Sequence, residues 1–376
     1  MIRHDRRAAL ARLAATAASL AACAALPPVH AAANPVPLKD LAKAKGLRFG
    51  NAVGYRYFKD PAYRALTARE CNVIVTENEM KWPFVEPQPG KYAYSEPDEM
   101  IAWARKEGMQ VRGHTLVWQP EKWLPEWVAA YDFGQGPAKA EKLLREHVTR
   151  VCRHFGKDIY SWDVVNEAIE PKTGEYRVNA FTQRLGAVDQ IELAFRVAHE
   201  QAPHAQLVYN DFMGEEADNA KHRAGVLKLL HELKKRGAPV QALGLQSHIG
   251  SSNNGRQKTD YREWRKFLDE VTGMGLDLLI TEFDVNDKSM PADIKQRDAG
   301  VAAVAKDYLD VTLSYPQTRD LLVWGIADHA SWLQTWEDAA RKDKLAQRPL
   351  PYDAALKAKP LREAIAASLK GMPQRG

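Results

Sequence analysis

Short apolar runs that end in polar residues recur along the chain, and helical patterns lie between them. The eight runs cover residues 47–54, 72–79, 110–118, 160–168, 205–212, 242–250, 276–285 and 321–328. The segment after the third run repeats apolar residues at helical spacing, as in Leu144, Val148 and Val151. Because the runs are apolar enough to be covered on both faces, we expect parallel strands with helices outside them. An eightfold count predicts a single α/β domain, a (β/α)8 TIM barrel over residues 35–376.

In such a barrel the carboxyl ends of the strands form the active-site face. Polar or aromatic residues stand at all eight predicted ends: Asn51; Glu77 and Asn78; His114 and Trp118; Asn166 and Glu167; Asn210 and Asp211; Gln246 and His248; Glu282 and Asp284; Trp324 and Asp328. Taken singly, each residue also fits a helix cap, a satisfied core imidazole or ordinary packing. Eight polar ends together indicate one convergent site.

The composition of this set narrows the chemistry. The sequence lacks a GxSxG elbow, an HExxH motif and the GxGxxG and GxxxxGK[ST] phosphate loops. Glycoside cleavage needs two carboxyl groups across one bond, one to protonate the leaving oxygen and one to attack carbon or activate water. The set also offers amides and imidazoles for sugar hydroxyls and indoles for sugar rings. It therefore favours a glycosidase.

Seven motifs make the interpretation specific. They are TENEMKW (76–82), GHTLVW (113–118), WDVVNEA (162–168), YND (209–211), QSH (246–248), ITEFDV (280–285) and WGIADHASW (324–332). In this order they resemble the glycoside hydrolase family 10 endo-1,4-β-xylanases, and the resemblance covers most of residues 40–365. It implies a TIM barrel that hydrolyses β-1,4-xylosidic bonds in xylan and xylooligosaccharides with retention of configuration.

Carried over residue by residue, the resemblance implies that Glu167 is the acid/base and Glu282 the nucleophile, with their carboxyl groups about 5 to 5.5 Å apart. It implies supporting roles for Asp284, as a partner of His248, and for Asn210. The implied substrate-binding residues are Glu77, Asn78, Lys81, His114, Trp118, Asn166, Gln246, His248, Trp324 and Trp332. No cofactor or metal is expected.

Three positions depart from the family pattern. Gln119 replaces a His that usually follows GHTLVW, with Trp123 as an additional residue of the same segment, and Leu333 stands where many members carry Arg. We expect Gln119 and Leu333 on loops near the cleft, where they would alter sugar subsites. Phe283 replaces a Leu, and strand alternation predicts that it points away from the site.

Two alternatives remain open at this point. One is a related barrel glycosidase that acts on another β-glycan, and the other is a carbohydrate-binding protein without activity. Hydrolysis of a polysaccharide panel separates the first from a xylanase. The presence of both glutamates argues against the second.

The N-terminal segment changes the expected location. Residues 1–31 contain Arg6 and Arg7, a small-residue apolar run too short to span a bilayer, and VHA at 29–31, which together predict a signal peptide. Export by the Sec or the twin-arginine route would give a periplasmic or secreted protein, and LAAC ending at Cys23 also resembles a lipoprotein signal. We expect no transmembrane segment.

Charge and cysteine content add little. The net charge of +5 falls to about +2 without the four Arg and one Asp of residues 1–31, so a nucleic-acid partner is not expected. Cys71 and Cys152 are expected as two small buried hydrophobes. We expect a monomer.

Overall fold

A computed structural model describes residues 35–250 and 259–375. The chain divides into two units, residues 1–36 and 37–376, of which the second is described here. The predicted signal peptide, with Cys23, lies outside the described residues and stays a prediction.

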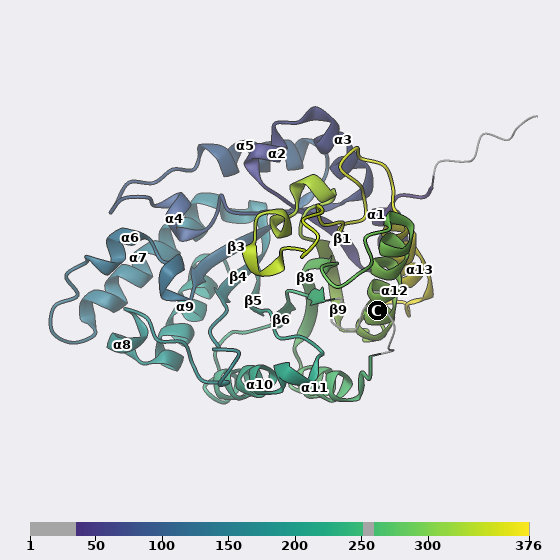
Figure 1. Ribbon diagram of the computed structural model, residues 1–376. Helices are drawn as coiled ribbons and strands as arrows, with labels where there is room; N and C mark the ends of the chain where they lie inside the picture. The colour runs from purple at the N-terminus through teal and green to yellow at the C-terminus, as the bar shows by residue number, and fades with distance from the viewer. Residues whose placement is uncertain (1–34, 251–258, 376) are drawn as a thin grey trace, which may run out of the picture. The chain divides into compact units, whose positions relative to one another are not determined.

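Among the described residues, nine parallel strands form the centre of this unit, and Figure 1 shows how they are arranged. They are β1 (Arg48–Val53), β2 (Val73–Thr76), β3 (Gln110–Trp118), β4 (Ile159–Asn166), β5 (Gln206–Asp211), β6 (Ala242–Leu245), β7 (His248–Gly250), β8 (Asp277–Asn286) and β9 (Thr318–Val323). Each strand pairs with its neighbour in the chain from β1 to β6, β1 also pairs with β9, and β8 pairs with β6 and β9. These pairings close the ring, which confirms the predicted (β/α)8 barrel.

The sixth predicted run, 242–250, is one strand in the sequence interpretation but two strands in the structure. The chain leaves the barrel wall at Gln246 and Ser247, where Ser247 has a φ of +60°. Both halves, β6 and β7, pair with β8. The break matters for the site because Gln246 and His248, on either side of Ser247, both line the pocket, where Gln246 contacts Glu167 and His248 contacts Glu282.

Helices follow the strands and cover the outside of the barrel (Figure 1). The longer ones are α3 (Pro61–Glu70), α5 (Ser95–Lys106), α7 (Ala138–Phe155), α9 (Ala187–Gln201), α10 (Ala220–Lys235), α11 (Arg262–Gly273), α12 (Ile294–Thr312) and α13 (Pro360–Gly371). Shorter ones are α1 (Leu38–Lys43), α2 (Tyr55–Phe58), α4 (Trp82–Val85), α6 (Glu126–Ala129) and α8 (Thr182–Leu185). Within the described ranges, no helix has the length and apolar content needed to cross a membrane.

The main apolar core lies between the strands and this helical layer. Gly113 on β3 makes room there for Trp162, since a Cβ at this glycine would lie 2.1 Å from the indole. The barrel also encloses buried charges, which apolar strand runs did not predict. Arg112 pairs with Asp163, and Asp320 pairs with Arg48 and accepts a hydrogen bond from Tyr160. Cys71 and Cys152 are buried free thiols, as predicted.

Candidate active site

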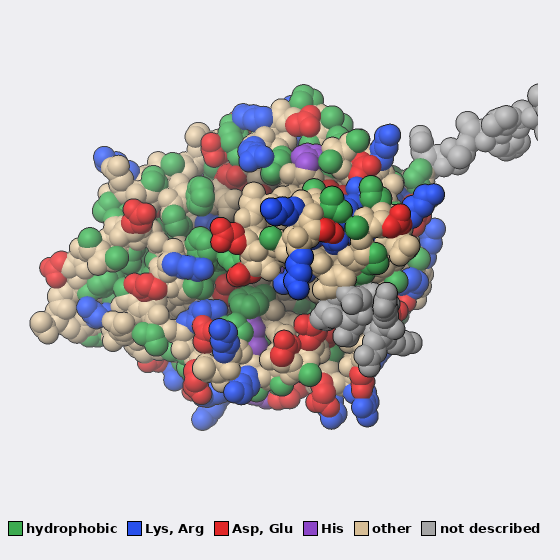
Figure 2. Space-filling model, viewed as in Figure 1, with side chains coloured by type: hydrophobic (Ala, Val, Ile, Leu, Met, Phe, Trp, Pro, Cys, Tyr) green, Lys and Arg blue, Asp and Glu red, His purple; other side chains and the backbone are tan. Residues whose placement is uncertain are grey.

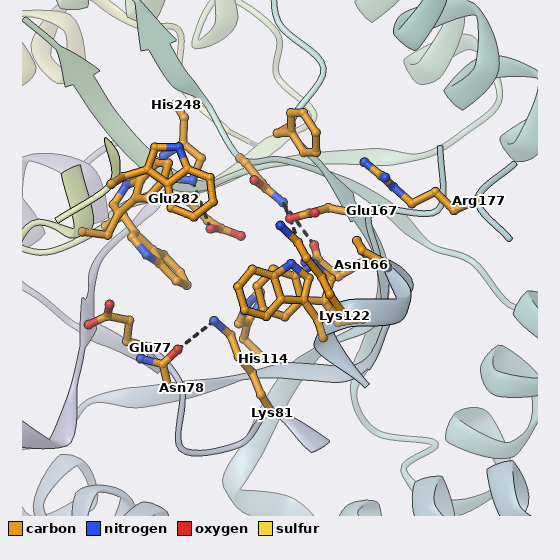
Figure 3. A pocket seen from close by; sticks show the side chains of 18 residues that line it. Glu77, Asn78, Lys81, His114, Lys122, Asn166, Glu167, Arg177, His248 and Glu282 are labelled. Atoms are coloured by element: carbon orange, nitrogen blue, oxygen red, sulfur yellow. Dashed lines mark hydrogen bonds and ion pairs between the residues drawn. The ribbon is translucent and has the colours of Figure 1, made fainter. Parts of the chain in front are cut away.

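Every residue predicted to be catalytic or to bind substrate lines one pocket, a cavity of about 540 Å³ at the carboxyl ends of the strands (Figure 3). The space-filling view shows this face hollowed near its centre, with apolar and histidine side chains inside (Figure 2). The two predicted supporting residues, Asp284 and Asn210, lie just behind the lining and contact it.

Glu282 is a buried carboxylate held on both oxygens. It stands on β8, where Asn210 donates to its Oε1 at 2.7 Å and His248 Nε2 lies 3.2 Å from its Oε2. Burial raises the pKa of Glu282, but the hydrogen bond from His248 and the charges of His114 and His248 outweigh burial and bring the pKa to about 2. Glu282 is therefore ionised at neutral pH.

His248 is the group that links Glu282 to Asp284. Its Nδ1 lies 3.1 Å from Asp284 Oδ1, and Trp332 donates its indole N–H to Asp284 Oδ2 at 2.7 Å. Burial lowers the pKa of His248, but the charge of Asp284 and the hydrogen bonds to Asp284 and Glu282 raise it to about 10. A cationic imidazole thus stands between two carboxylates.

Glu167 follows β4 and has a left-handed backbone, with a φ of +58°. Such a conformation costs a non-glycine residue roughly 1–2 kcal/mol. Its side chain accepts from Gln246 at 3.0 Å and from Asn166 at 3.2 Å, both on Oε1. Burial raises the pKa of Glu167, and the negative charges of Asp211 and Glu282 raise it further. The two glutamates therefore have opposite tendencies to bind a proton.

Three amides connect the glutamates. Asn210 Nδ2 donates to Asn166 Oδ1 at 2.9 Å as well as to Glu282, and Gln246 Nε2 lies 3.2 Å from the same Asn166 oxygen. Thr281 donates to Asn210 Oδ1 at 2.7 Å. Gly244 on β6 leaves space for this amide, because a Cβ there would lie 2.1 Å from Asn210 Oδ1. Asn166 and Asn210 are thus fixed relative to both carboxylates.

The opposite wall carries the remaining polar groups. Lys81 donates to Asn78 Oδ1 at 2.9 Å and lies 4.5 Å from the ring centroid of Trp118. His114 is held by Asp163, with Nδ1 and Oδ2 2.9 Å apart. Burial raises the pKa of Glu77 to about 7, although the charge of Lys81 opposes this shift. These side chains offer donors and acceptors suited to sugar hydroxyls.

Indoles form the sides of the pocket. Trp118 stacks on Trp123 with ring centroids 4.5 Å apart, and the ring centroids of Trp332 and Trp336 lie 5.4 Å apart. Trp324 also lines the pocket and contacts the rings of His114 and His248 edge-on. Flat apolar faces of this kind suit the faces of sugar rings.

Not every polar residue at a predicted strand end lines the pocket. Asn51 points outward and bonds Tyr63 and Thr67, and Asp211 bonds His222 of α10. Asp328 pairs with Lys359. Successive residues of a strand face opposite sides, so a polar residue at a strand end is as often directed to the helices as to the pocket.

Gln119 and Leu333, two of the departures from the family pattern, have buried side chains. Gln119 is 1% exposed and exchanges hydrogen bonds with Gln190 and Asn179, and Leu333 is 4% exposed. Neither lines the pocket itself, but both lie on loops beside residues that do, namely Trp118 and Pro120 for Gln119 and Trp332 for Leu333. Phe283 is buried against Tyr308, pointing away from the site as expected.

Sequence reasoning missed several lining residues. These are Pro120, Lys122, Arg177, Phe212 and Trp336. They lie on loops or just past a strand end, where neither hydrophobic periodicity nor the position of the strand end predicts a pocket residue. Only the extra Trp123 in the segment after β3 pointed to this region. Among the described residues, no cluster of three or more His, Cys, Asp or Glu has the arrangement of a metal site.

Comparison with known proteins gives one consistent result. The profile of the family described as glycosyl hydrolase family 10 matches residues 37–368. The chain is 32% identical over 306 residues to endo-1,4-beta-xylanase B of Thermotoga neapolitana, covering 79% of this chain and 83% of that protein. It is 32% identical over 308 residues to a beta-1,4-xylanase of Dictyoglomus thermophilum, covering 77% and 80%.

Solved structures agree with these sequence relatives. Native xylanase 10B from Thermotoga maritima superimposes with a TM-score of 0.78 at 29% identity, over 89% of this chain and 98% of that chain. Xylanase 10B from Thermotoga petrophila, solved in complex with xylobiose, gives the same TM-score and identity over 89% and 97%.

Proposed function

The chain belongs to glycosyl hydrolase family 10 and is an endo-1,4-β-xylanase, and we propose that Glu282 is its nucleophile and Glu167 its acid/base. The observation that carries the proposal is the contrast between the two glutamates of one pocket. The pKa of Glu282 is lowered to about 2 by His248, whereas burial and neighbouring negative charges raise the pKa of Glu167. One carboxyl is thus ready to attack while the other still holds a proton.

In the first step, a carboxylate oxygen of Glu282 attacks the anomeric carbon of the sugar and the glycosidic C–O bond breaks. The proton of Glu167 goes to the leaving oxygen, so the departing chain leaves as an alcohol. The product is a covalent glycosyl ester of Glu282. Asn166 lies beside Glu167 and suits the sugar 2-hydroxyl, a contact that strengthens as positive charge develops on the ring.

In the second step, Glu167 acts as a base. The ester at Glu282 carries no charge, so one source of repulsion at Glu167 disappears and its carboxylate is stabilised. Glu167 takes a proton from water while the water oxygen attacks the anomeric carbon and the ester bond breaks. Two inversions give a product with the original configuration.

The wall of indoles supports xylose as the sugar. Trp324 and Trp332 line the pocket near Glu282, and their bulk leaves little room for the CH2OH group of a hexose. The relative from Thermotoga petrophila was solved with xylobiose. A polysaccharide panel tests the assignment: faster release of reducing ends from xylan than from β-glucan or β-mannan is expected, and the reverse order would contradict it.

Glutamate variants test the roles. E282Q is expected to lose nearly all activity on every glycoside. E167Q should lose most activity on xylooligosaccharides but keep its kcat/KM on aryl xylobiosides with an activated phenol, because such a leaving group needs no proton in the first step. Its kcat on these substrates should still fall, because the second step lacks its base. An active E282Q would show that another residue attacks.

We also propose that the protein is exported and acts in the periplasm or outside the cell. The support is the sequence of residues 1–31 alone. Fractionation of cells that express the full chain, with the N-terminus of the product determined by mass spectrometry, is expected to find an exported protein shortened near Ala31, or lipidated at Cys23. A full-length cytoplasmic protein would contradict export.

A further inference from the structure

Asp211 and His222 form a buried pair that the proposed reaction does not use. Asp211 ends β5, and His222 lies in the first turn of α10. Both side chains are 0% exposed, and His222 Nε2 lies 2.9 Å from Asp211 Oδ1. The same oxygen accepts the backbone N–H of Phe212 at 2.8 Å. Burial of ionisable groups this deep in the protein is costly unless they are paired and hydrogen-bonded.

The pair is connected to the backbone of the acid/base through Tyr209. The Tyr209 hydroxyl donates to Asp211 Oδ2 and accepts the backbone N–H of Ala168 at 3.1 Å. The backbone N–H of Glu167 donates to the carbonyl of Asn210 at 2.9 Å. β5 therefore holds the left-handed backbone of Glu167 on both of its sides, and Asp211 fixes the hydroxyl that makes one of these contacts.

The pair also affects the charge of the acid/base. His222 Nε2 contacts Asp211 Oδ1, whereas His222 Nδ1 has no hydrogen-bond partner among the residues that the structure describes. The negative charge of Asp211 raises the pKa of Glu167 in addition to burial.

We propose that Asp211 is a positioning residue for the acid/base: through the hydroxyl of Tyr209 it holds the backbone between Glu167 and Ala168. The proposal rests on the role of Glu167 given above. Other charged groups also face Glu167, namely Glu282 from β8 and the cations Lys81, Lys122 and Arg177 in the pocket lining. None of them is changed in the test below.

The test compares two aryl β-xylobiosides, one with an activated phenol and one with a poor leaving group. In D211N, kcat/KM for the poor leaving group is expected to fall about tenfold more than for the activated one, because only the former needs the acid. Removal of the charge lowers the pKa of Glu167, so the basic limb of the pH profile should move about one unit to lower pH. Tyr209→Phe keeps the ring in the core and should show the same selective loss.

Two control variants, D310N and E167Q, complete the test. D310N removes a carboxylate that contacts Lys306 and Ser368 on the outer helices, and it should change neither substrate ratio nor pH profile. This proposal alone is wrong if E167Q loses activity mainly on the poor leaving group while D211N and Y209F lose activity equally on both substrates and keep the basic limb of the pH profile in place. If E167Q also loses activity equally on both substrates, the proposed role of Glu167 is wrong too. If D211N does not fold, the substrate ratio of Y209F decides.

Discussion

At the scale of the residue, the chemistry depends on which neighbours each glutamate has. Glu282 accepts from a cationic imidazole, and Glu167 accepts from two amides and lies near other carboxylates. The pKa of Glu282 is about 2 and that of Glu167 is raised. We therefore expect kcat/KM to be nearly flat through the mildly acidic range and to fall only at the pH where Glu167 loses its proton. A pH profile on xylotriose, with an acidic limb near pH 5, would contradict the low pKa of Glu282.

Asp284→Asn tests how that low pKa arises. The charge of Asp284 makes the largest contribution to keeping His248 protonated. Its removal therefore lowers the pKa of His248, and a neutral His248 stabilises the Glu282 anion less. The pKa of Glu282 should rise, and the acidic limb of kcat/KM should move to higher pH by about one unit or more. An unchanged acidic limb in a folded D284N protein would show that His248 does not need Asp284.

Gly244→Ala tests the placement of Asn210. The new Cβ would lie 2.1 Å from Asn210 Oδ1, so the amide that donates to Glu282 must move. Because misplacement near a reacting group is costly, we expect kcat to fall by about tenfold to a hundredfold. Gly273→Ala is the matched control, since nothing lies within 4 Å of a Cβ there. Equal activities of the two variants would contradict the account of Asn210.

At the scale of the element, the loops after β3 and β9 meet over the pocket. Lys122 Nζ lies 4.7 Å from the ring centroid of Trp123 and 5.8 Å from that of Trp336. The Lys122 ammonium thus links the two loops through cation–π contacts, and an exposed contact of this kind contributes about 0.5–1 kcal/mol. Lys122→Ala should raise KM for xylohexaose a few-fold with little change in kcat. The exposed Lys142→Ala serves as control, and a KM equal to that of the control would argue against the link.

The elements also show what the sequence could and could not predict. The strands were predictable because buried parallel strands are continuous apolar runs. The place of Glu167 and Glu282 in the pocket was predictable because their strand ends carry specific motifs. The break between β6 and β7 was not predictable, since the positive φ falls on Ser247 rather than on a glycine. Lys122 and Trp336 were missed because loop packing, not periodicity, brings them to the pocket.

At the scale of the whole molecule, a buried ion-pair network fastens the segment after β9 to the barrel. Lys359 lies 3.0 Å from both oxygens of Asp328 and 3.8 Å from Asp298, and it donates to the carbonyl of Arg348 at 2.7 Å. Trp332 and Trp336, which line the pocket, lie in the segment between Asp328 and Lys359. The network therefore positions part of the site as well as closing the fold.

Lys359→Met tests this network. It removes the nearest cation from the buried carboxylate of Asp328, while Arg348 still pairs with Asp298 and lies 3.8 Å from Asp328. The free energy of unfolding should fall by about 3 kcal/mol, the lower end of the range for a broken buried pair. Lys370→Met on the exposed side of α13 is the control and should change it little. The measurement is urea unfolding followed by tryptophan fluorescence. A loss in Lys359→Met no larger than in the control would show that the network contributes no net stability.

The most direct test of the central claim is the anomeric configuration of the first products. Purified enzyme is mixed with linear β-1,4-xylohexaose, and the anomeric protons are followed by NMR before mutarotation. A nucleophilic Glu282 and an acid/base Glu167 predict short xylooligosaccharides that appear first as β-anomers. Early α-anomers would mean that water attacks directly, which contradicts a covalent intermediate on Glu282.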